Sequence, residues 1–313
     1  MAEDADGRAA AAPRDAATVI LLHECGERAE ALLVRRHADL AFMGGAWVFP
    51  GGKVESADFS ARALARCRDV ADRELEALAE TSGRMLSREM ALGLYVAACR
   101  ETFEETGVLL ARYANGEPCD GRTAARLRSR RGAVCRDASL FTQLLEEQDL
   151  VIEPACFVYW AHWITPSAAP QRFDARFFAV SMPADQLAQC DSAETSELSW
   201  LDLRSFGELP AESFISAPPT RFSLADVAAR LREHGNLERT LTLERHRCVP
   251  PIVPKMTQID GKATAVLPWD ASYASLPGEG TPSQLAMPER YLDLPSRVIA
   301  RHEIRAPRHT PAP

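Results

Sequence analysis

The stretch RETFEETGV, residues 100–108, places three glutamates where they could act together on one substrate. In a helix, the side chains of Glu101, Glu104 and Glu105 fall within an arc of roughly 100° and repel one another. Gly107 is a plausible helix terminator, and the negative end of the helix dipole would increase this repulsion. Because hard oxygen ligands suit Mg²⁺ or Mn²⁺, a divalent cation is the economical way to offset these charges. These residues therefore predict a metal site.

A solvated acidic helix face is the competing interpretation of such a cluster. It would also have to explain Arg100 before the glutamates, Gly107 after them and the glycine-rich stretch FPGGKVE upstream. Gly51 and Gly52 in that stretch are typical turn residues, because glycine tolerates unusual backbone conformations. We expect this turn to bring its backbone close to the metal.

Together these residues resemble the signature of the Nudix hydrolases. That signature is a glycine, five residues, an acid, seven residues, and then R-E-U-x-E-E-x-G-U, where U is apolar. Its second half matches residues 100–108, with Thr102 at an apolar position. Its first half matches Gly52 and Asp58, although the family usually has glutamate at the second position. The spacer is residues 59–99 instead of seven residues, so an insertion splits the motif, which a loop-to-helix junction can absorb.

The resemblance implies a role for each residue of the motif. Glu101, Glu104 and Glu105 would ligate Mg²⁺ or Mn²⁺, with the carbonyl region of Gly52 at the loop edge of the site. Arg100 would hold the loop or a neighbouring glutamate through a charge-assisted hydrogen bond. Asp58 would take the orienting role of the first acid, and we place Asp58 and Gly51 beside the substrate.

A general base is also needed, and the sequence offers more than one. Glu101 and Glu105 lie in the motif itself, while the loop DSAETSE adds Asp191, Glu194 and Glu197. In the resembling enzymes a loop carboxylate often assists from outside the motif, and Glu197 is our choice here. An exposed loop acid without a catalytic role is the equal alternative for Glu197.

The substrate class follows from longer segments. The combination of the split motif RETFEETGVLL with FMGGAWVFPGG and WITPSAAPQRFDARFF resembles the peroxisomal-type coenzyme A diphosphatase branch and its bacterial relatives. The coenzyme A signature of that branch, LLT with a run of arginines before FPGG, is only partly matched, by LLVRR. This resemblance implies hydrolysis of the diphosphate of coenzyme A or acyl-CoA to adenosine 3′,5′-bisphosphate and (acyl-)4′-phosphopantetheine. ADP-ribose or a nucleotide sugar is the alternative substrate. A non-catalytic nucleotide-binding module is the alternative from another class, and the intact glutamate trio speaks against it.

Further arginines and leucines could recognise such a substrate. Arg35 and Arg36 follow a predicted strand and could hold a 3′-phosphate by a forked contact, or could be ordinary strand-end surface residues. Arg172 and Arg176 carry the same hypothesis. Three leucines of the insertion could cover a pantetheine or acyl arm, or could simply pack on the core; they are Leu75, Leu78 and Leu86.

The elements that position these residues are readable from hydrophobic periodicity and end signals. Ser87 and Gly107 predict a helix over residues 88–106, and Ser223 is the predicted cap of a helix in the segment from 218 onward. A further helix is predicted at 138–147, and strands at 17–24, 29–35, 155–164, 175–181 and 197–202. With the resemblance, this order predicts an α/β fold, a Nudix-type α/β/α sandwich with a mixed sheet. We expect a disordered tail (1–14), a Nudix domain (15–205) with a helical insertion within 59–99, and a helical and irregular extension (206–313).

Composition limits the partners and the compartment. The 313 residues carry a net charge of −8 and the pI is near 5.5, which argues against binding to nucleic acid or membrane surfaces. We expect a small-molecule nucleoside diphosphate derivative as partner, with a homodimer as an option. The eight cysteines show no CxxC pair, and the chain shows no signal-peptide pattern and ends in PAP without a peroxisomal SKL-type address. A cytoplasmic location is the expectation.

Overall fold

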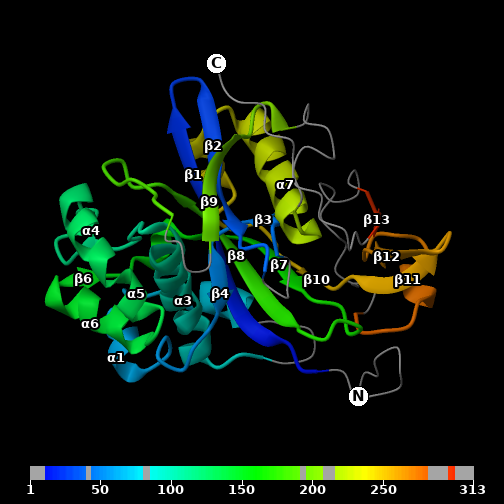
Figure 1. The fold of residues 1–313 in the computed structure, drawn as a ribbon, viewed down its shortest axis with the longest axis horizontal. Coiled ribbons are helices and arrows are strands. Elements are labelled where there is room, and N and C mark those ends of the chain that lie inside the picture. The colour runs from blue at the N-terminus through cyan, green and yellow to red at the C-terminus, as the bar shows by residue number, and fades with distance from the viewer. Residues whose placement is uncertain are drawn as a thin grey trace.

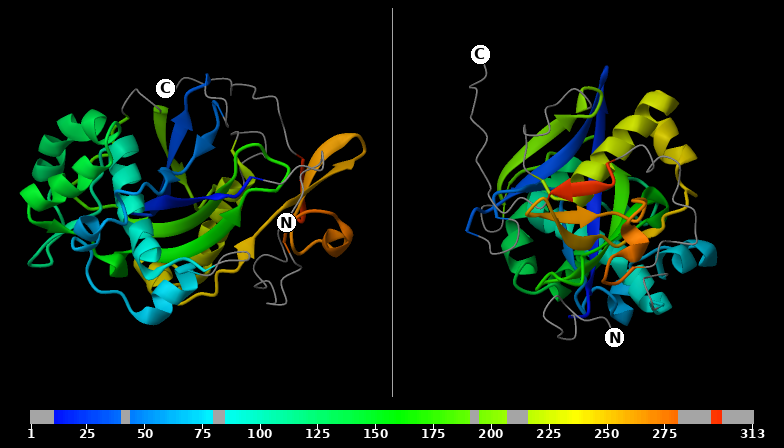
Figure 2. Two further views of the ribbon diagram at one scale, coloured as in Figure 1. Left: turned by 90° about the horizontal axis from the view of Figure 1, so that it is seen from below. Right: turned by 90° about the vertical axis from the view of Figure 1, so that its right-hand side faces the viewer.

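The computed structural model describes residues 11–39, 44–79, 85–190, 195–206, 216–280 and 295–299. Within these ranges the chain forms a mixed β-sheet between two helical layers, as Figures 1 and 2 show. The predicted α/β class with a mixed sheet is confirmed. Most of the predicted tail, residues 1–10, lies outside the described residues, and the first strand begins at Arg14.

The large sheet is built around β1, which changes partner along its length. Its strands are β1 (Arg14–Cys25), β2 (Arg28–Arg36), β3 (Trp47–Val48), β4 (Gly51–Lys53), β7 (Val158–Ile164), β8 (Phe173–Ser181), β9 (Thr195–Asp202) and β10 (Pro251–Ile252). They follow the order β10-β7-β8-β1-β2-β3, with β4 paired to β1 and β9 paired to β2. One part of β1 pairs with β4 and a later part pairs with β2, both antiparallel, while β8 lies parallel on its other side. Gly51 and Gly52, which were expected in a turn, are thereby placed in a short strand in the middle of the sheet.

One face of the sheet is covered by α3 (Arg88–Thr106) together with α1 (Ala61–Leu64) and α2 (Asp72–Ala79). The predicted bounds of α3 are confirmed: Ser87 caps it by accepting from Met90 N, and Gly107 ends it in the left-handed conformation at φ 71°. The three leucines of the insertion, Leu75, Leu78 and Leu86, are buried in the same apolar core as α3. They therefore pack on the core, and the prediction that they cover a substrate arm is wrong.

A group of short elements lies beside α3, on the left of Figure 1. It comprises β5 (Arg112–Tyr113), α4 (Gly121–Leu127), the 3₁₀ turn Arg128–Arg130, α5 (Arg131–Val134), α6 (Ser139–Glu147), β6 (Leu150–Val151) and the 3₁₀ turn Pro154–Cys156. The insertion joins this group through Ile152, whose N–H donates to Arg66 O at 2.7 Å and whose O accepts from Arg68 N at 2.9 Å. The insertion in the motif thus extends the helical layer.

The opposite face is covered by α7 (Pro218–His234) and α8 (Leu237–Leu243). The prediction that Ser223 caps a helix here is wrong, because α7 begins at Pro218 after Ala217, and Ser223 is buried inside the helix. Proline suits the first turn because its fixed φ is helical and its missing N–H would be unpaired there anyway.

The extension also contains a second sheet, made of β11 (Lys255–Ile259), β12 (Lys262–Val266) and β13 (Arg297–Ile299), with a 3₁₀ turn at Tyr273–Ser275. Figure 2 shows its hairpin projecting from the body of the molecule. The extension, expected to be helical and irregular, thus also contains regular strands. Asp260 and Gly261 both have positive φ in the hairpin turn, and an Asp-Gly pair between short β-forming runs is the signal that could have revealed it.

Candidate active site

Arg100 is the centre of the charged cluster at the end of α3. Its Nε and Nη2 donate to the two carboxylate oxygens of Asp58, both at 2.8 Å. Its Nη1 donates to Glu101 at 2.9 Å and to Glu104 at 3.0 Å, and Nη2 also donates to Lys53 O at 3.0 Å. The arginine side chain is buried, with 3% exposed, so these charge-assisted bonds form where water competes little.

Asp58 connects the two halves of the split motif. Its carboxylate also accepts from Glu55 N at 2.8 Å, and the residue is 1% exposed. The segment that carries Asp58 crosses α3 at Gly93, where an added Cβ would lie 2.8 Å from Phe59 Cβ. Both oxygens hold Arg100 and the loop of Asp58 itself, which agrees with the orienting role expected for this residue; its contact with substrate stays a prediction. Asp58 is a positioning residue.

Gly51 and Gly52 of β4 lie against the carboxylates of α3. Gly51, at φ 156°, donates its N–H to Glu105 Oε2 at 3.0 Å, and a Cβ there would meet Ala17 O at 2.5 Å. A Cβ on Gly52 would lie 2.5 Å from Glu101 Oε1. A side chain at Gly51 would clash with the β1 backbone, and one at Gly52 would displace the Glu101 carboxylate, so glycine at both positions lets this backbone lie against β1 and the acidic cluster.

Arg100 offsets part of the negative charge of the cluster. It holds Glu101, Glu104 and the loop at Lys53 O through charge-assisted bonds, as expected from its place in the motif. Three carboxylates (Asp58, Glu101 and Glu104) share this one guanidinium, so negative charge remains in excess around Arg100. Burial raises the pKa of Glu101 to about 7, and it also raises the pKa of Glu104. The cluster is therefore short of positive charge.

The donor set fits a divalent cation. Glu101, Glu104 and Glu105 supply hard carboxylate oxygens next to backbone that only glycine can provide. In the described part of the chain, no three acidic, histidine or cysteine side chains already surround a common point. Instead, Glu101 and Glu104 accept hydrogen bonds from Arg100, and Glu105 accepts one from the N–H of Gly51. To ligate one ion together, these oxygens would have to exchange some of those bonds for the metal.

Glu197 and Arg35, two other predicted site residues, contact each other. They are cross-strand neighbours on β9 and β2, with Arg35 Nη1 3.3 Å from Glu197 Oε2, and Arg35 also donates to Gly45 O. The Arg35 guanidinium lies 6.0 Å from the centre of the Trp47 ring. By strand alternation this pair is on the sheet face that α7 covers, opposite α3. The structure thus brings Glu197 to Arg35 and not into contact with the α3 carboxylates.

The remaining predicted residues are distributed as follows. Arg36 is half-buried at the end of β2, where its N–H donates to Ala46 O at 3.0 Å. Asp191 and Glu194 lie outside the described residues. The hypothesis that Arg172 and Arg176 bind a phosphate is wrong, because both side chains are 0% exposed and engaged in ion pairs with Glu279, Asp15 and Asp174.

Two residues that were not singled out from the sequence hold the chain just after the glutamates. The Gln186 side-chain oxygen accepts a hydrogen bond from Leu109 N–H at 2.8 Å. Its amide nitrogen donates to Leu109 O at 3.0 Å and to Cys119 O at 2.9 Å. Arg131 donates to the backbone oxygen of Glu104. Neither residue belongs to a recognisable motif, and both act on backbone atoms far away in sequence, so no local signal reveals them.

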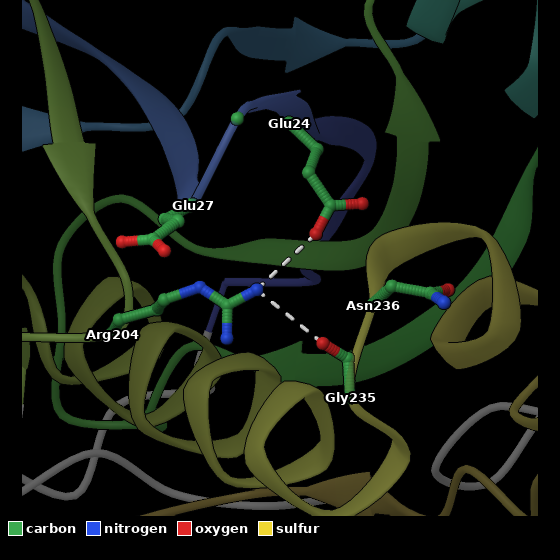
Figure 3. Close-up of a pocket in the computed structure, with 6 residues that line it drawn as sticks. Glu24, Glu27, Arg204, Gly235 and Asn236 are labelled. Atoms are coloured by element: carbon green, nitrogen blue, oxygen red, sulfur yellow. Dashed lines mark hydrogen bonds and ion pairs between the residues drawn. The ribbon is translucent and has the colours of Figure 1, made fainter.

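Figure 3 shows a surface depression elsewhere on the molecule, between the β1–β2 turn and the α7–α8 turn. Arg204 crosses it to Glu24 Oε1 and to Gly235 O, each at 3.3 Å. None of its lining residues belongs to the predicted site. It therefore does not compete with the α3 cluster as the active site. In the described part of the chain, no helix is both long and apolar enough to cross a membrane.

Comparisons with known proteins agree with this geometry. The family model described as the NUDT19 Nudix domain matches residues 13–226, which is 214 of the 313 residues. The chain is 25% identical over 276 residues to the acyl-coenzyme A diphosphatase NUDT19 of Xenopus laevis, covering 79% of this chain and 72% of that protein. It is 31% identical over 179 residues to the same-named protein of Gallus gallus, covering 48% and 47%.

Among solved structures, the fold is similar to that of a Nudix hydrolase from Alicyclobacillus acidocaldarius. The TM-score is 0.57 at 24% identity, and the match covers 74% of this chain and 96% of that one. A likeness at this identity supports the fold, while the family match over most of the chain assigns the family. The protein therefore belongs to the Nudix hydrolase superfamily, in the branch represented by the NUDT19 Nudix domain.

Proposed function

We propose that this Nudix hydrolase cleaves the diphosphate linkage of coenzyme A or acyl-CoA in a Mg²⁺- or Mn²⁺-dependent reaction. The products would be adenosine 3′,5′-bisphosphate and (acyl-)4′-phosphopantetheine. The observation that carries this proposal is the match of residues 13–226 to the NUDT19 domain, together with the restored motif around Arg100. The relatives that carry the name acyl-coenzyme A diphosphatase support the substrate class.

The chain's residues contribute mainly by position and charge. Glu101, Glu104 and Glu105 would hold the metal, which when bound neutralises diphosphate charge and activates a water. Arg100 fixes two of these side chains, and Asp58 in turn fixes Arg100. Because burial raises the pKa of Glu101, this carboxyl holds a proton more readily than an exposed one would, so cation binding and proton release are linked.

The roles of Glu197, Arg35 and Arg36 also belong to the proposal. Glu197 is half-exposed and, among the residues that the structure describes, pairs with Arg35, so it retains acceptor capacity for a proton from water. Arg35 uses Nε and Nη1 in its contacts with Gly45 and Glu197, and a phosphate would have to share the guanidinium with that carboxylate. Arg36 at the end of the same strand is the second candidate for the 3′-phosphate.

The deciding experiment is product identification by mass spectrometry after incubation with coenzyme A, acyl-CoA, ADP-ribose and a nucleotide sugar, each with Mg²⁺ or Mn²⁺. Adenosine 3′,5′-bisphosphate and 4′-phosphopantetheine are the expected products. Faster cleavage of ADP-ribose than of coenzyme A would contradict the proposed substrate.

A matched pair of variants tests the site itself. Glu104→Gln removes a carboxylate of the cluster, whereas Glu89→Gln makes the same change at an exposed position in the first turn of the same helix. We expect hydrolysis to fall by several orders of magnitude in the first variant only. Equal activity of the two variants would remove Glu104 from the proposed metal site.

A further inference from the structure

The carbonyl groups at the end of α3 are held by partners from distant parts of the chain. Thr106 O accepts from Gln189 N at 2.7 Å. Glu104 O accepts twice from Arg131, from Nε at 3.0 Å and from Nη2 at 2.7 Å. A helix normally leaves its last carbonyls to water or to a cap, so a buried guanidinium on this oxygen is a specific arrangement.

Arg131 caps the end of α3 and also joins it to the segment around Gln189. Its Nη1 donates to Gln189 O at 2.9 Å, and the residue is only 4% exposed. Gln189 in turn donates to Thr106 O, so arginine, helix end and the segment around Gln189 form one closed set of hydrogen bonds. The backbone that carries Glu104 and Glu105 is therefore fixed from outside the helix.

The positive charge of Arg131 lies at the C-terminal end of α3, beside the glutamate cluster. The C-terminal end of a helix carries partial negative charge, and the glutamate cluster lies in the same turns. Arg100 pairs with the carboxylates, whereas Arg131 pairs with the helix carbonyl behind them. The two arginines together offset both sources of negative charge and keep the carboxylates crowded at one place.

We propose that Arg131 is a positioning residue for the metal-binding carboxylates, fixing the last turn of α3 and thereby raising the affinity of the site for a divalent cation. This inference rests on the proposed function, because it assumes that Glu101, Glu104 and Glu105 are the ligands. Residues that orient metal ligands typically change metal affinity by about 10–100-fold when they are replaced.

The test is Mn²⁺ binding to the full chain without substrate, measured by calorimetric titration or by loss of the free-ion resonance signal. Arg131→Gln should weaken Mn²⁺ binding by roughly 10-fold or more. Arg131→Lys should lose less, because lysine keeps the charge but cannot make the forked contact. Arg130→Gln is the matched control, since Arg130 is the preceding residue and forms a partly exposed pair with Glu147. Its Mn²⁺ affinity should equal that of the unchanged protein.

Folding is followed by urea denaturation of each variant. A folded Arg131→Gln protein that binds Mn²⁺ within twofold of Arg130→Gln would overturn the inference. If the glutamine variant does not fold, the lysine variant is judged by the same criterion. Hydrogen exchange on the unchanged protein gives a further test, since Mn²⁺ should protect the amides of Gly107 and Gln189 together. Protection of Gly107 alone would overturn the coupling.

The two proposals fail in different ways. If the unchanged protein and Arg130→Gln neither bind Mn²⁺ nor cleave coenzyme A, the proposed function fails. If both bind and cleave while Arg131→Gln is indistinguishable from them, only the role of Arg131 fails.

Discussion

Arg100 and Asp58 are 42 residues apart in the chain, yet the guanidinium donates to both oxygens of the Asp58 carboxylate at 2.8 Å. This bidentate pair closes the Nudix motif across its insertion. Its geometry is the forked contact that arginine makes with a carboxylate, which adds directional specificity to charge attraction. The insertion can be accommodated because this pair joins the loop before it to the helix after it, together with the bonds from Arg100 to Lys53 O and from Gly51 N to Glu105.

Removal of the Asp58 charge tests that statement. Asp58→Asn should lower the free energy of unfolding by roughly 3–5 kcal/mol, because it leaves the buried Arg100 without its main partner. Asp72→Asn is the control, since Asp72 pairs with Arg88 with both side chains largely exposed. We expect the control to lose less than about 1 kcal/mol. Urea denaturation followed by circular dichroism measures both, and equal losses would show that the Arg100–Asp58 pair is not structural.

Gly52→Ala should lower activity without lowering the stability of the fold. The added Cβ would lie 2.5 Å from Glu101 Oε1, so the carboxylate must move, while the backbone of Gly52 is not in the left-handed region. We expect kcat/KM for coenzyme A to fall on the order of 100-fold, as displaced catalytic groups do, with little change in the unfolding midpoint. Gly132→Ala, whose Cβ would meet only Arg136 Nη1 at 3.6 Å, should retain full activity. Unchanged kinetics in Gly52→Ala would show that the close approach is unimportant.

Gly93→Ala tests the crossing of the insertion over α3. Alanine in a helix interior normally stabilises by about 1 kcal/mol relative to glycine. Here the Cβ would lie 2.8 Å from Phe59 Cβ and 3.4 Å from Asp58 O, so the loop must shift. We expect overpacking to outweigh propensity, with a net loss of about 1–3 kcal/mol in chemical denaturation. A more stable variant would mean that the loop is not held against the helix.

His162 makes stability depend on pH. It lies buried with Asp174 at 2.6 Å, while Arg176 bonds both Asp174 and Asp15. Burial lowers the pKa of His162 below its ordinary value, although Asp174 opposes this shift. The unfolded chain therefore binds a proton first as pH falls below about 6.5, and the free energy of unfolding decreases in that range.

His162→Gln should abolish that part of the pH dependence, which amounts to at most about 1.4 kcal/mol per pH unit for one proton. Urea denaturation at a series of pH values between neutral and mildly acidic measures the slope. His246→Gln is the control, because His246 is exposed, and it should keep the slope of the unchanged protein. An identical slope in both variants would assign the dependence to other groups.

Much of the chemistry was readable from local sequence. Helix α3 was predicted with its observed bounds because Ser87 and Gly107 are end signals that act through hydrogen bonds within a few residues. Strands β1, β2, β7, β8 and β9 were located to within a few residues because alternation is also local. The clustering of three glutamates on one helix followed from helical geometry alone. These features need no knowledge of which segment lies beside which.

Pairing across long stretches of chain was decided by the tertiary structure. Arg35 and Glu197 are 162 residues apart, and only the pairing of β2 with β9 makes them neighbours. Arg176 looked like a phosphate ligand but is buried against Asp15 and Asp174, because the parallel pairing of β1 and β8 brings these strands together. The partner of a charged side chain depends on which segments pack together, and a long-range contact leaves no periodic trace in the sequence. For that reason the sequence determined the identity of the acidic residues, whereas the fold decided which arginines serve them.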